Sequence, residues 1–353
     1  MHWGDWRRVL DAALQAAERD GDRHGRSVCL RAFGHHHNER GEHERAAGCF
    51  EAALDELDEL NDDHELVAAL VGLADAHWSR GHPTAATGLL RRALEVLRDL
   101  GDAGREAWAL YMLALATTSL GRLGEAQALH RKAIERYRRV GYRRGEAYAS
   151  HGLATALLEA GNAAEAAALY ERAQQLARDA GDDTFGALRY GLGFARRDQG
   201  RLEEATRELR AALAISRDLH YKRGQVYALH GLGTTAHRRT RIDEAVAELQ
   251  RAHALAREMG DQRMTARILR ALGEVRLDQR RSGEAISILR TAVEIASHNE
   301  LRLIEANTRA SLARALLADG ADEDAADELE RSELIKRELE LDAGGTLLVA
   351  GSR

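Results

Sequence analysis

Proline, cysteine and aromatic residues are all scarce in this sequence. A single proline, Pro83, occurs in 353 residues, and aromatic residues make up only 5%. Ala, Leu, Arg and Glu dominate instead, a composition that favours helix and leaves little material for β-structure. The two cysteines, Cys29 and Cys49, are too few for a disulfide framework. We therefore expect an all-helical protein with two packed, free thiols in a reducing, cytoplasmic setting.

Long apolar runs and an excess of positive charge are also missing. No segment approaches the roughly 20 apolar residues that a membrane helix needs. The first residues, MHWGDWRRVL, lack the hydrophobic core of a signal peptide. The formal net charge is −6, whereas a dedicated nucleic-acid binder normally carries a basic domain. These absences predict a soluble chain with no membrane partner and no nucleic-acid partner.

Motifs for catalysis, cofactors and metals are missing as well. We find no Gly-rich phosphate loop, no HExxH or CxxC pattern and no spacing that sets a nucleophile beside a base. The carboxylates lie four residues from arginines, as Glu203 and Arg207 do, which is typical of solvated helix surfaces. His35, His36 and His37 are consecutive, and consecutive side chains on a helix point about 100° apart, so they do not converge on one ion. We predict no enzyme activity, no cofactor and no metal.

What the sequence does contain is a repeat of 40 residues. Its clearest copy, Gly121–Gly161, holds two helical patterns, about Leu123–Val140 and Arg144–Ala160, with Gly141 between them. The glycine that ends the first helix of each pair returns along the chain at Gly41, Gly81, Gly121, Gly161, Gly200 and Gly320, with Thr240 and Arg280 in the two remaining places. One repeat is 39 residues long, and we place the missing residue in the turn GDDTFG at 181–186.

The repeat predicts one N-terminal helix followed by eight antiparallel helix pairs, each with a first helix A and a second helix B. The lone helix covers 3–20, and residues 342–353 are expected to form a flexible tail. The whole of 1–341 is expected to be a single array, with pairs near 23–60, 63–100, 103–140, 143–180, 183–219, 222–259, 262–299 and 301–341.

Three columns of residues recur at fixed places in the pairs. Helix A carries a large apolar residue followed by Gly or Ala: Phe33-Gly34, Leu73-Ala74, Leu113-Ala114, Leu153-Ala154, Leu192-Gly193, Leu232-Gly233, Leu272-Gly273 and Leu312-Ala313. Helix B carries an alanine twelve residues later and a second one seven further on, except that Ser332 closes the second series. Between them lies a large residue: Phe50, Leu90, His130, Tyr170, Leu209, Leu249, Leu289 and Leu329. Small side chains at these places allow helices to approach closely.

These columns resemble the tetratricopeptide repeat (TPR) over nearly the whole chain. The resemblance implies a right-handed superhelix, an α-solenoid whose A helices line the inner surface. Two features differ from that family: the period is 40 rather than 34, and glycine replaces the proline that usually follows helix B. Aspartates come directly after the residue of this turn, which is Asn61 in one repeat and glycine in the others, and are expected to cap the next helix: Asp22, Asp62, Asp102, Asp182 and Asp261.

Forty-residue repeats of the form GxxxEA…GDRxGEA are similar to the arrays of actinobacterial STAND (NB-ARC) and SARP regulators. They also resemble the bacterial peptide-receptor regulators and the animal Pins/LGN scaffolds. In those families the array is the sensing or docking part, so the resemblance implies a protein-binding or peptide-binding module. No P-loop or winged helix is found here, and we expect an array standing alone or one cut from a larger protein.

The inner stripe of the A helices supplies the candidate binding residues. In a TPR this stripe follows one helix face at spacings of three and four residues, and here it collects six of the sixteen Trp, Tyr and Phe residues. The candidate residues are Trp108, Tyr111, Tyr148, His151, Tyr190, Phe194, Arg197, Tyr227, His230, Arg238, Arg267 and Arg270. They could form a groove for a peptide or helix, with arginines contacting carboxylates. Alternatively, the tyrosines pack against neighbouring A helices and meet no partner.

Other functions compete with peptide binding. Apolar residues at the ends, Trp3, Trp6 and Val9 on one side and Leu334, Ile335 and Leu339 on the other, suggest a scaffold that self-associates through its terminal helices. The oligomeric state stays open. A chaperone-tail adaptor is disfavoured, because the Lys and Asn places of its carboxylate clamp hold Arg31 and His35.

Overall fold

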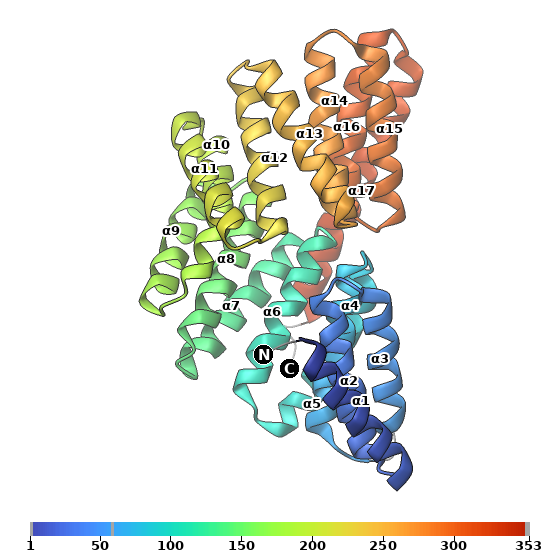
Figure 1. The fold of residues 1–353 in the computed structure, drawn as a ribbon. Helices are drawn as coiled ribbons and strands as arrows, with labels where there is room; N and C mark the ends of the chain where they lie inside the picture. The colour runs from blue at the N-terminus through green and yellow to red at the C-terminus, as the bar shows by residue number, and fades with distance from the viewer. Residues whose placement is uncertain (1–2, 58–59, 350–353) are drawn as a thin grey trace. The chain divides into compact units, whose positions relative to one another are not determined.

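Helices with short turns between them make up the part of the chain that can be described. The computed structural model describes the backbone of residues 3–57 and 60–349, and the side chains of these except 3–6, 183–184, 187 and 340–349. No strand occurs in that part (Figure 1). In order, the helices are α1 Trp3–Asp20, α2 Arg23–Glu39, α3 His43–Leu57, α4 Asp63–Ser79, α5 Pro83–Leu100, α6 Ala103–Ser119, α7 Leu123–Arg139, α8 Arg143–Glu159, α9 Ala163–Asp179, η1 Asp183–Arg189, α10 Tyr190–Asp198, α11 Leu202–Asp218, α12 Lys222–Arg238, α13 Ile242–Glu258, α14 Gln262–Asp278, α15 Ser282–His298, α16 Arg302–Asp319 and α17 Asp322–Val349.

The all-helical architecture of a lone helix followed by antiparallel pairs is confirmed. From α2 to α17, even-numbered helices are the A helices and odd-numbered ones the B helices. The chain falls into two compact units, residues up to Ala116 and residues from Thr117 onward. No helix among the described residues has the length and apolar character required to cross a bilayer.

One A helix differs from the expectation. The helix expected at 183–199 begins as seven residues of 3₁₀-helix, η1, and becomes α-helical only at Tyr190. This is the repeat of 39 residues, and the irregular segment overlaps the turn to which the missing residue was assigned. Because a 3₁₀-helix rises about 2.0 Å per residue against 1.5 Å in an α-helix, the shorter segment spans a comparable length.

The turns follow the capping pattern of the sequence. The glycines at both turns are left-handed, with Gly161 at φ 88° as an example, and Thr240 and Arg280 adopt the same conformation at φ 58° and 59°. Four of the five expected aspartate caps are confirmed, because Asp22, Asp62, Asp102 and Asp261 each accept a hydrogen bond from the backbone N–H three residues on. Asp182 differs: it precedes the 3₁₀-helix and pairs with Arg144 at 2.7 Å.

The large residue of helix B packs between two A helices, as Leu209 shows. Leu209 of α11 is fully buried, with Gly193 of α10 on one side and Gly231 of α12 on the other. A Cβ atom at Gly193 would lie 2.6 Å from Leu209 Cγ, and one at Gly231 would lie 2.4 Å from Leu209 Cδ2. The two alanine columns are fully buried as well. Close approach at these small residues therefore sets the spacing of the pairs.

His130 occupies the same place in α7 and is fully buried. Gly152 of α8 faces its ring, since a Cβ atom there would lie 2.3 Å from His130 Cε1. At the corresponding place in α17, Leu329 is 41% exposed.

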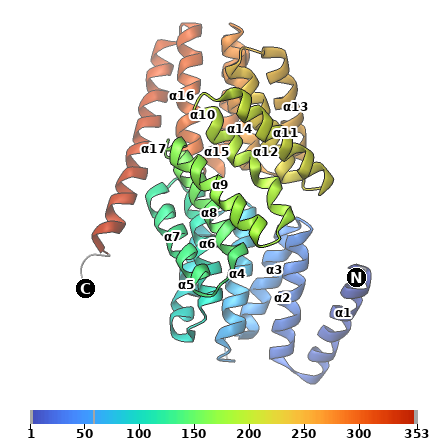
Figure 2. The same ribbon diagram turned by 90° about the vertical axis from the view of Figure 1, so that its left-hand side faces the viewer.

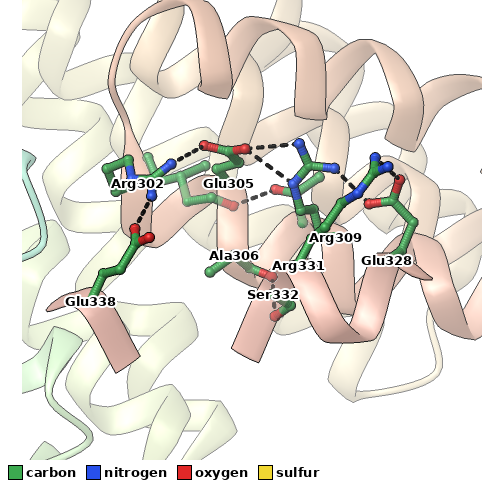
Figure 3. A network of polar contacts seen from close by, with 10 residues as sticks. Arg302, Glu305, Ala306, Arg309, Glu328, Arg331, Ser332 and Glu338 are labelled. Atoms are coloured by element: carbon green, nitrogen blue, oxygen red, sulfur yellow. Dashed lines mark hydrogen bonds and ion pairs between the residues drawn. The ribbon is translucent and has the colours of Figure 1, made fainter. Parts of the chain in front are cut away.

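A polar network joins the last helix pair (Figure 3). Arg309 of α16 lies between Glu305 of the same helix, at 2.9 Å, and Glu328 of α17, at 2.7 Å. Ser332 donates a hydrogen bond to the carbonyl of Ala306 at 2.8 Å. The alanine that closes the other pairs is thus replaced here by a serine with a specific backbone partner.

The expected self-association surface at the C-terminal end is largely used inside the protein. Ile335 is buried, and Leu339 approaches Gly121 where α17 lies beside α7 (Figure 2). Leu334 and Val9 are exposed, whereas the side chains of Trp3 and Trp6 lie outside the described residues. The scaffold interpretation is therefore not favoured. Helix α17 continues to Val349, past the expected end at 341, and residues 350–353 of the expected tail lie outside the described residues.

The packing of Leu209 predicts that Gly231→Ala will destabilise the protein by about 1–3 kcal/mol, since the buried leucine is already held from both sides. Gly283 of α15 is the matched control: a Cβ atom there meets nothing within 4 Å. Gly283→Ala should raise stability by about 0.5–1 kcal/mol through its higher helix propensity. Urea unfolding followed by circular dichroism measures both. A Gly231→Ala variant as stable as the wild type would contradict the close-approach model.

Candidate functional site

Six candidate residues of the unit from Thr117 onward form a continuous series of ring contacts across three A helices. They lie three or four residues apart on each helix, which places them on one helix face. The centroids of neighbouring rings are 5.9 Å apart for His151 and Tyr190, 4.6 Å for Tyr190 and Tyr227, 5.9 Å for Tyr190 and Phe194, and 5.9 Å for Phe194 and His230. Tyr148 joins through Phe185 of η1, at 5.2 Å from Tyr148 and 5.9 Å from His151. We call these six candidates the ring ladder.

The ring ladder is partly covered rather than fully exposed. Tyr190 and Tyr227 stack with an interplanar angle of 22°, and both are half-buried. His151 also meets the edge of Tyr170, at 5.0 Å, and Thr155 shares a hydrogen bond of 2.9 Å with the hydroxyl of Tyr170. The tyrosines thus pack in part against neighbouring A helices, as the second interpretation of the stripe expects. Tyr148 and Phe194 are half-buried as well, whereas His230 is buried.

Two arginines, one on α10 and one on α12, lie next to the ring ladder. The guanidinium carbon of Arg197 lies 5.2 Å from the centroid of the Phe194 ring, a cation–π arrangement. Its Nη1 donates a hydrogen bond to Thr234 at 2.8 Å. Arg238 donates to the backbone carbonyl of Arg197 at 2.8 Å, and both arginines pair with Asp198.

Arg267 and Arg270 of α14 form contacts that the sequence analysis did not identify. Glu159, the last residue of α8, accepts hydrogen bonds from Arg267 at 2.5 Å and from Arg263 at 3.2 Å. Arg270 lies 3.7 Å from Glu274, which Arg314 of α16 also contacts at 3.3 Å. Burial alone would raise the pKa of Glu159, but Arg267 and Arg263 lower it below its ordinary value.

Glu159 and Arg263 would have been included if the inner stripe of the A helices had been extended. Glu159 lies four residues beyond Thr155 on α8, and Arg263 lies four residues before Arg267 on α14. Extending the inner stripe by one turn at each end therefore includes both. Their pairing across six intervening helices is a tertiary contact, for which the sequence carries no local signal.

Trp108 and Tyr111 belong to the other unit. Their rings are 5.6 Å apart on α6, and Trp108 is 48% exposed. They form a local aromatic pair within that unit.

The consecutive histidines have local partners, and the two cysteines are free thiols. His35 packs edge-on against Phe50 at 5.1 Å, and His37 Nδ1 lies 2.7 Å from a carboxylate oxygen of Glu42. Cys29 is buried and Cys49 half-buried, both as free thiols, and burial raises the pKa of each. Among the described residues, no group of three or more His, Cys, Asp or Glu side chains is arranged to hold a metal ion.

Comparison with known proteins identifies the repeats. The family model for the tetratricopeptide repeat matches residues 105–179 and 183–258, so these residues are tetratricopeptide repeats. None of the curated proteins matches the sequence.

Solved structures share the fold over almost the full chain. A Rap protein complexed with Competence and Sporulation Factor has a TM-score of 0.71 at 15% identity, covering 96% of this chain and 97% of that one. The Rap conjugation gene regulator of plasmid pLS20 in complex with the Phr* peptide has a TM-score of 0.67 at 14% identity, with coverages of 94% and 95%. The apo quorum sensor NprR from B. thuringiensis has a TM-score of 0.59 at 14% identity, with coverages of 94% and 99%. At such identities the likeness shows a common fold.

Buried histidines predict a loss of stability in acid. Burial lowers the pKa of His130 to about 3 and that of His151 to about 4, although a hydrogen bond with the Leu188 carbonyl partly opposes the shift at His151. Burial also lowers the pKa of His230, as do the charges of Arg197, Arg267 and Arg270. The unfolded chain takes up protons below about pH 6.5 while the folded chain does not, so the free energy of unfolding falls as the pH falls from about 6.5 towards 4.

His130 alone should account for about 2 kcal/mol of the drop in unfolding free energy between pH 7 and pH 5. His130→Leu, which installs the residue found at this place in other repeats, should make the drop smaller by that amount. Urea unfolding at both pH values measures it. His298→Leu, at the exposed end of α15, is the control and should leave the drop as in the wild type. An equal drop in His130→Leu and wild type would refute the assignment.

Proposed function

We propose that this array of repeats is a non-enzymatic binding module that recognises a peptide or an extended protein segment along the inner stripe of its A helices. One observation carries the proposal: the ring ladder, with half-buried aromatic faces, runs directly into arginines on the same face of the unit from Thr117 onward. Rigid aromatic side chains and arginines are the residues most often used as anchors in protein recognition.

The chemistry of the stripe suits an extended chain. Stacked rings offer apolar surface at little cost in side-chain entropy, because Tyr190 and Tyr227 already hold each other in place. Arginines at one end of the ladder, such as Arg197, supply several N–H donors in a fixed fork for carbonyl or carboxylate groups. A peptide laid along the A helices would meet apolar contacts first and charged contacts after.

The structural neighbours support this proposal by analogy. Two of them are described as complexes, one with Competence and Sporulation Factor and the other with the Phr* peptide. We infer by the same analogy that this array is the sensing part of a bacterial regulator in the cytoplasm. The resemblance to STAND and SARP arrays stays a prediction.

The proposal predicts that the protein will select a defined family of sequences from a displayed library of random heptapeptides. A variant with Tyr148, Tyr190 and Tyr227 replaced by alanine should lose binding of the selected peptides at least tenfold, because the aromatic anchors are removed. The same three positions changed to leucine keep apolar packing volume and serve as a second test should the alanine variant unfold.

Circular dichroism checks that each variant keeps its helicity. Tyr142→Ala is the matched control, because Tyr142 is an exposed tyrosine at the N-cap of α8 whose ring contacts Tyr137 of α7 and no ladder residue in the ring series. Library selection that yields no peptide, or undiminished binding by the folded leucine variant, would overturn the proposed function.

A further inference from the structure

Three carboxylates and six arginines alternate on the A helices at one end of the ring ladder. Each carboxylate is shared by two arginines: Glu159 by Arg263 and Arg267, Asp198 by Arg197 and Arg238, and Glu274 by Arg270 and Arg314. These nine residues, which we call the arginine cluster, carry three more positive than negative charges. Arg238 and Arg314 are exposed, whereas Arg263, Arg267 and Arg270 of α14 are partly buried. Positive charge on these α14 side chains favours a further anion, because water solvates it poorly there.

Two nitrogen atoms of the cluster, Arg267 Nε and Arg270 Nε, are buried without a hydrogen-bond partner among the described residues. Nδ1 of the neighbouring ladder residue His230 is in the same state, and His230 is only 8% exposed. Burial lowers the pKa of Arg270, and the charges of Arg267, Arg197 and Arg314 lower it further against the opposing effect of Glu274. Arg267 and Arg270 therefore keep N–H donors on α14 that the protein's own carboxylates do not use.

Glu159 reaches this cluster from a distant part of the array. It stands at the end of α8, three helix pairs before α14, and its side chain is 11% exposed between Arg263 and Arg267. Arg263 is held in turn by Ser119 of α6, at 3.1 Å. Arg267 is therefore bound through Nη2 by a carboxylate from three helix pairs away, while its Nε has no hydrogen-bond partner among the described residues.

We propose that the arginine cluster binds a carboxylate of the peptide ligand at Arg267 and Arg270 beside His230, and that Glu159 is its internal competitor. This inference rests on the proposed function and names the ligand class: a peptide whose apolar part lies on the ring ladder and whose acidic group enters the cluster. Binding exchanges one carboxylate for another, so Arg267 keeps a charged partner and is not left with a buried unpaired charge. The released Glu159 frees α8 from α14.

The carboxylate can belong to an Asp or Glu side chain or to the C-terminus of the ligand. Both offer the same two oxygens, for which the guanidinium fork is the matched donor. The spacing of the acid from the apolar residues in the selected peptides then reflects the distance from Tyr190 to the cluster.

The test uses the full chain and the displayed random heptapeptides. Wild-type protein should enrich peptides with an acidic group at one fixed position. Arg270→Met should still select peptides with the same apolar residues but without the acid preference, and should bind the wild-type peptide at least tenfold more weakly. Arg210→Met, a change of equal charge on the exposed face of α11, should alter neither property.

Glu159→Gln tests the competitor. It should bind the selected acidic peptide at least threefold more tightly than wild type, while Glu135→Gln, the same charge change on the exposed face of α7, should not. Thermal unfolding confirms that Glu159→Gln is folded. Arg263→Gln, which removes one of the two partners of Glu159, gives a second measurement with the same expected direction should Glu159→Gln prove unstable.

Synthetic versions of the selected peptide identify the source of the carboxylate. Loss of affinity on C-terminal amidation assigns the C-terminus, and loss on replacing Asp or Glu by the amide residue assigns a side chain. Equal affinity of all versions, or an acid preference that survives in Arg270→Met, would overturn the inference while leaving peptide binding intact. If Glu159→Gln and Arg263→Gln both bind the peptide as the wild type does, Glu159 is not a competitor of the ligand. Selection of no peptide at all would refute the proposed function and this inference with it.

Discussion

The distance between neighbouring A helices is set by one large side chain of helix B. This side chain packs against a glycine of the A helix on each side. Leu209 between Gly193 and Gly231 shows the arrangement most clearly, and Phe50 between Gly34 and Gly72 repeats it in the other unit. Each contact leaves no room for a methyl group, so the spacing is fixed by contact rather than by general hydrophobic attraction. The spacing of the side chains on the inner face of the A helices follows from this contact.

The ring ladder is one result. Because successive A helices approach so closely, a tyrosine on one reaches a tyrosine at the matching height of the next, and Tyr190 stacks on Tyr227 at 4.6 Å. The two rings hold neighbouring A helices together and are still only half-buried. The same spacing brings arginines from α10, α12 and α14 near one another, where mutual repulsion is relieved by shared carboxylates.

Much of the fold could be predicted because short sequence signals mark each helix and recur in every repeat. Left-handed glycines and capping aspartates mark helix ends, and the columns mark the buried faces, so the boundaries of α2 or α14 follow from a few residues. The 3₁₀ segment η1 could not be predicted, because a missing residue can be absorbed by the turn or by the helix. At the site, the members of the inner stripe followed from helix periodicity. The link from Glu159 to Arg263 and Arg267 did not, since it joins residues more than one hundred positions apart through the curvature of the array.

That link also changes how this part of the chain should unfold. In a repeat array that contacts only its neighbours, stability is a sum of local terms and the ends fray independently. Here α8 is tied to α14, and α7 lies against α17, so the first and last pairs of the unit from Thr117 onward depend on each other. The helices between them are expected to melt as a single cooperative block, and a cut in any of their turns would weaken pairs at both ends.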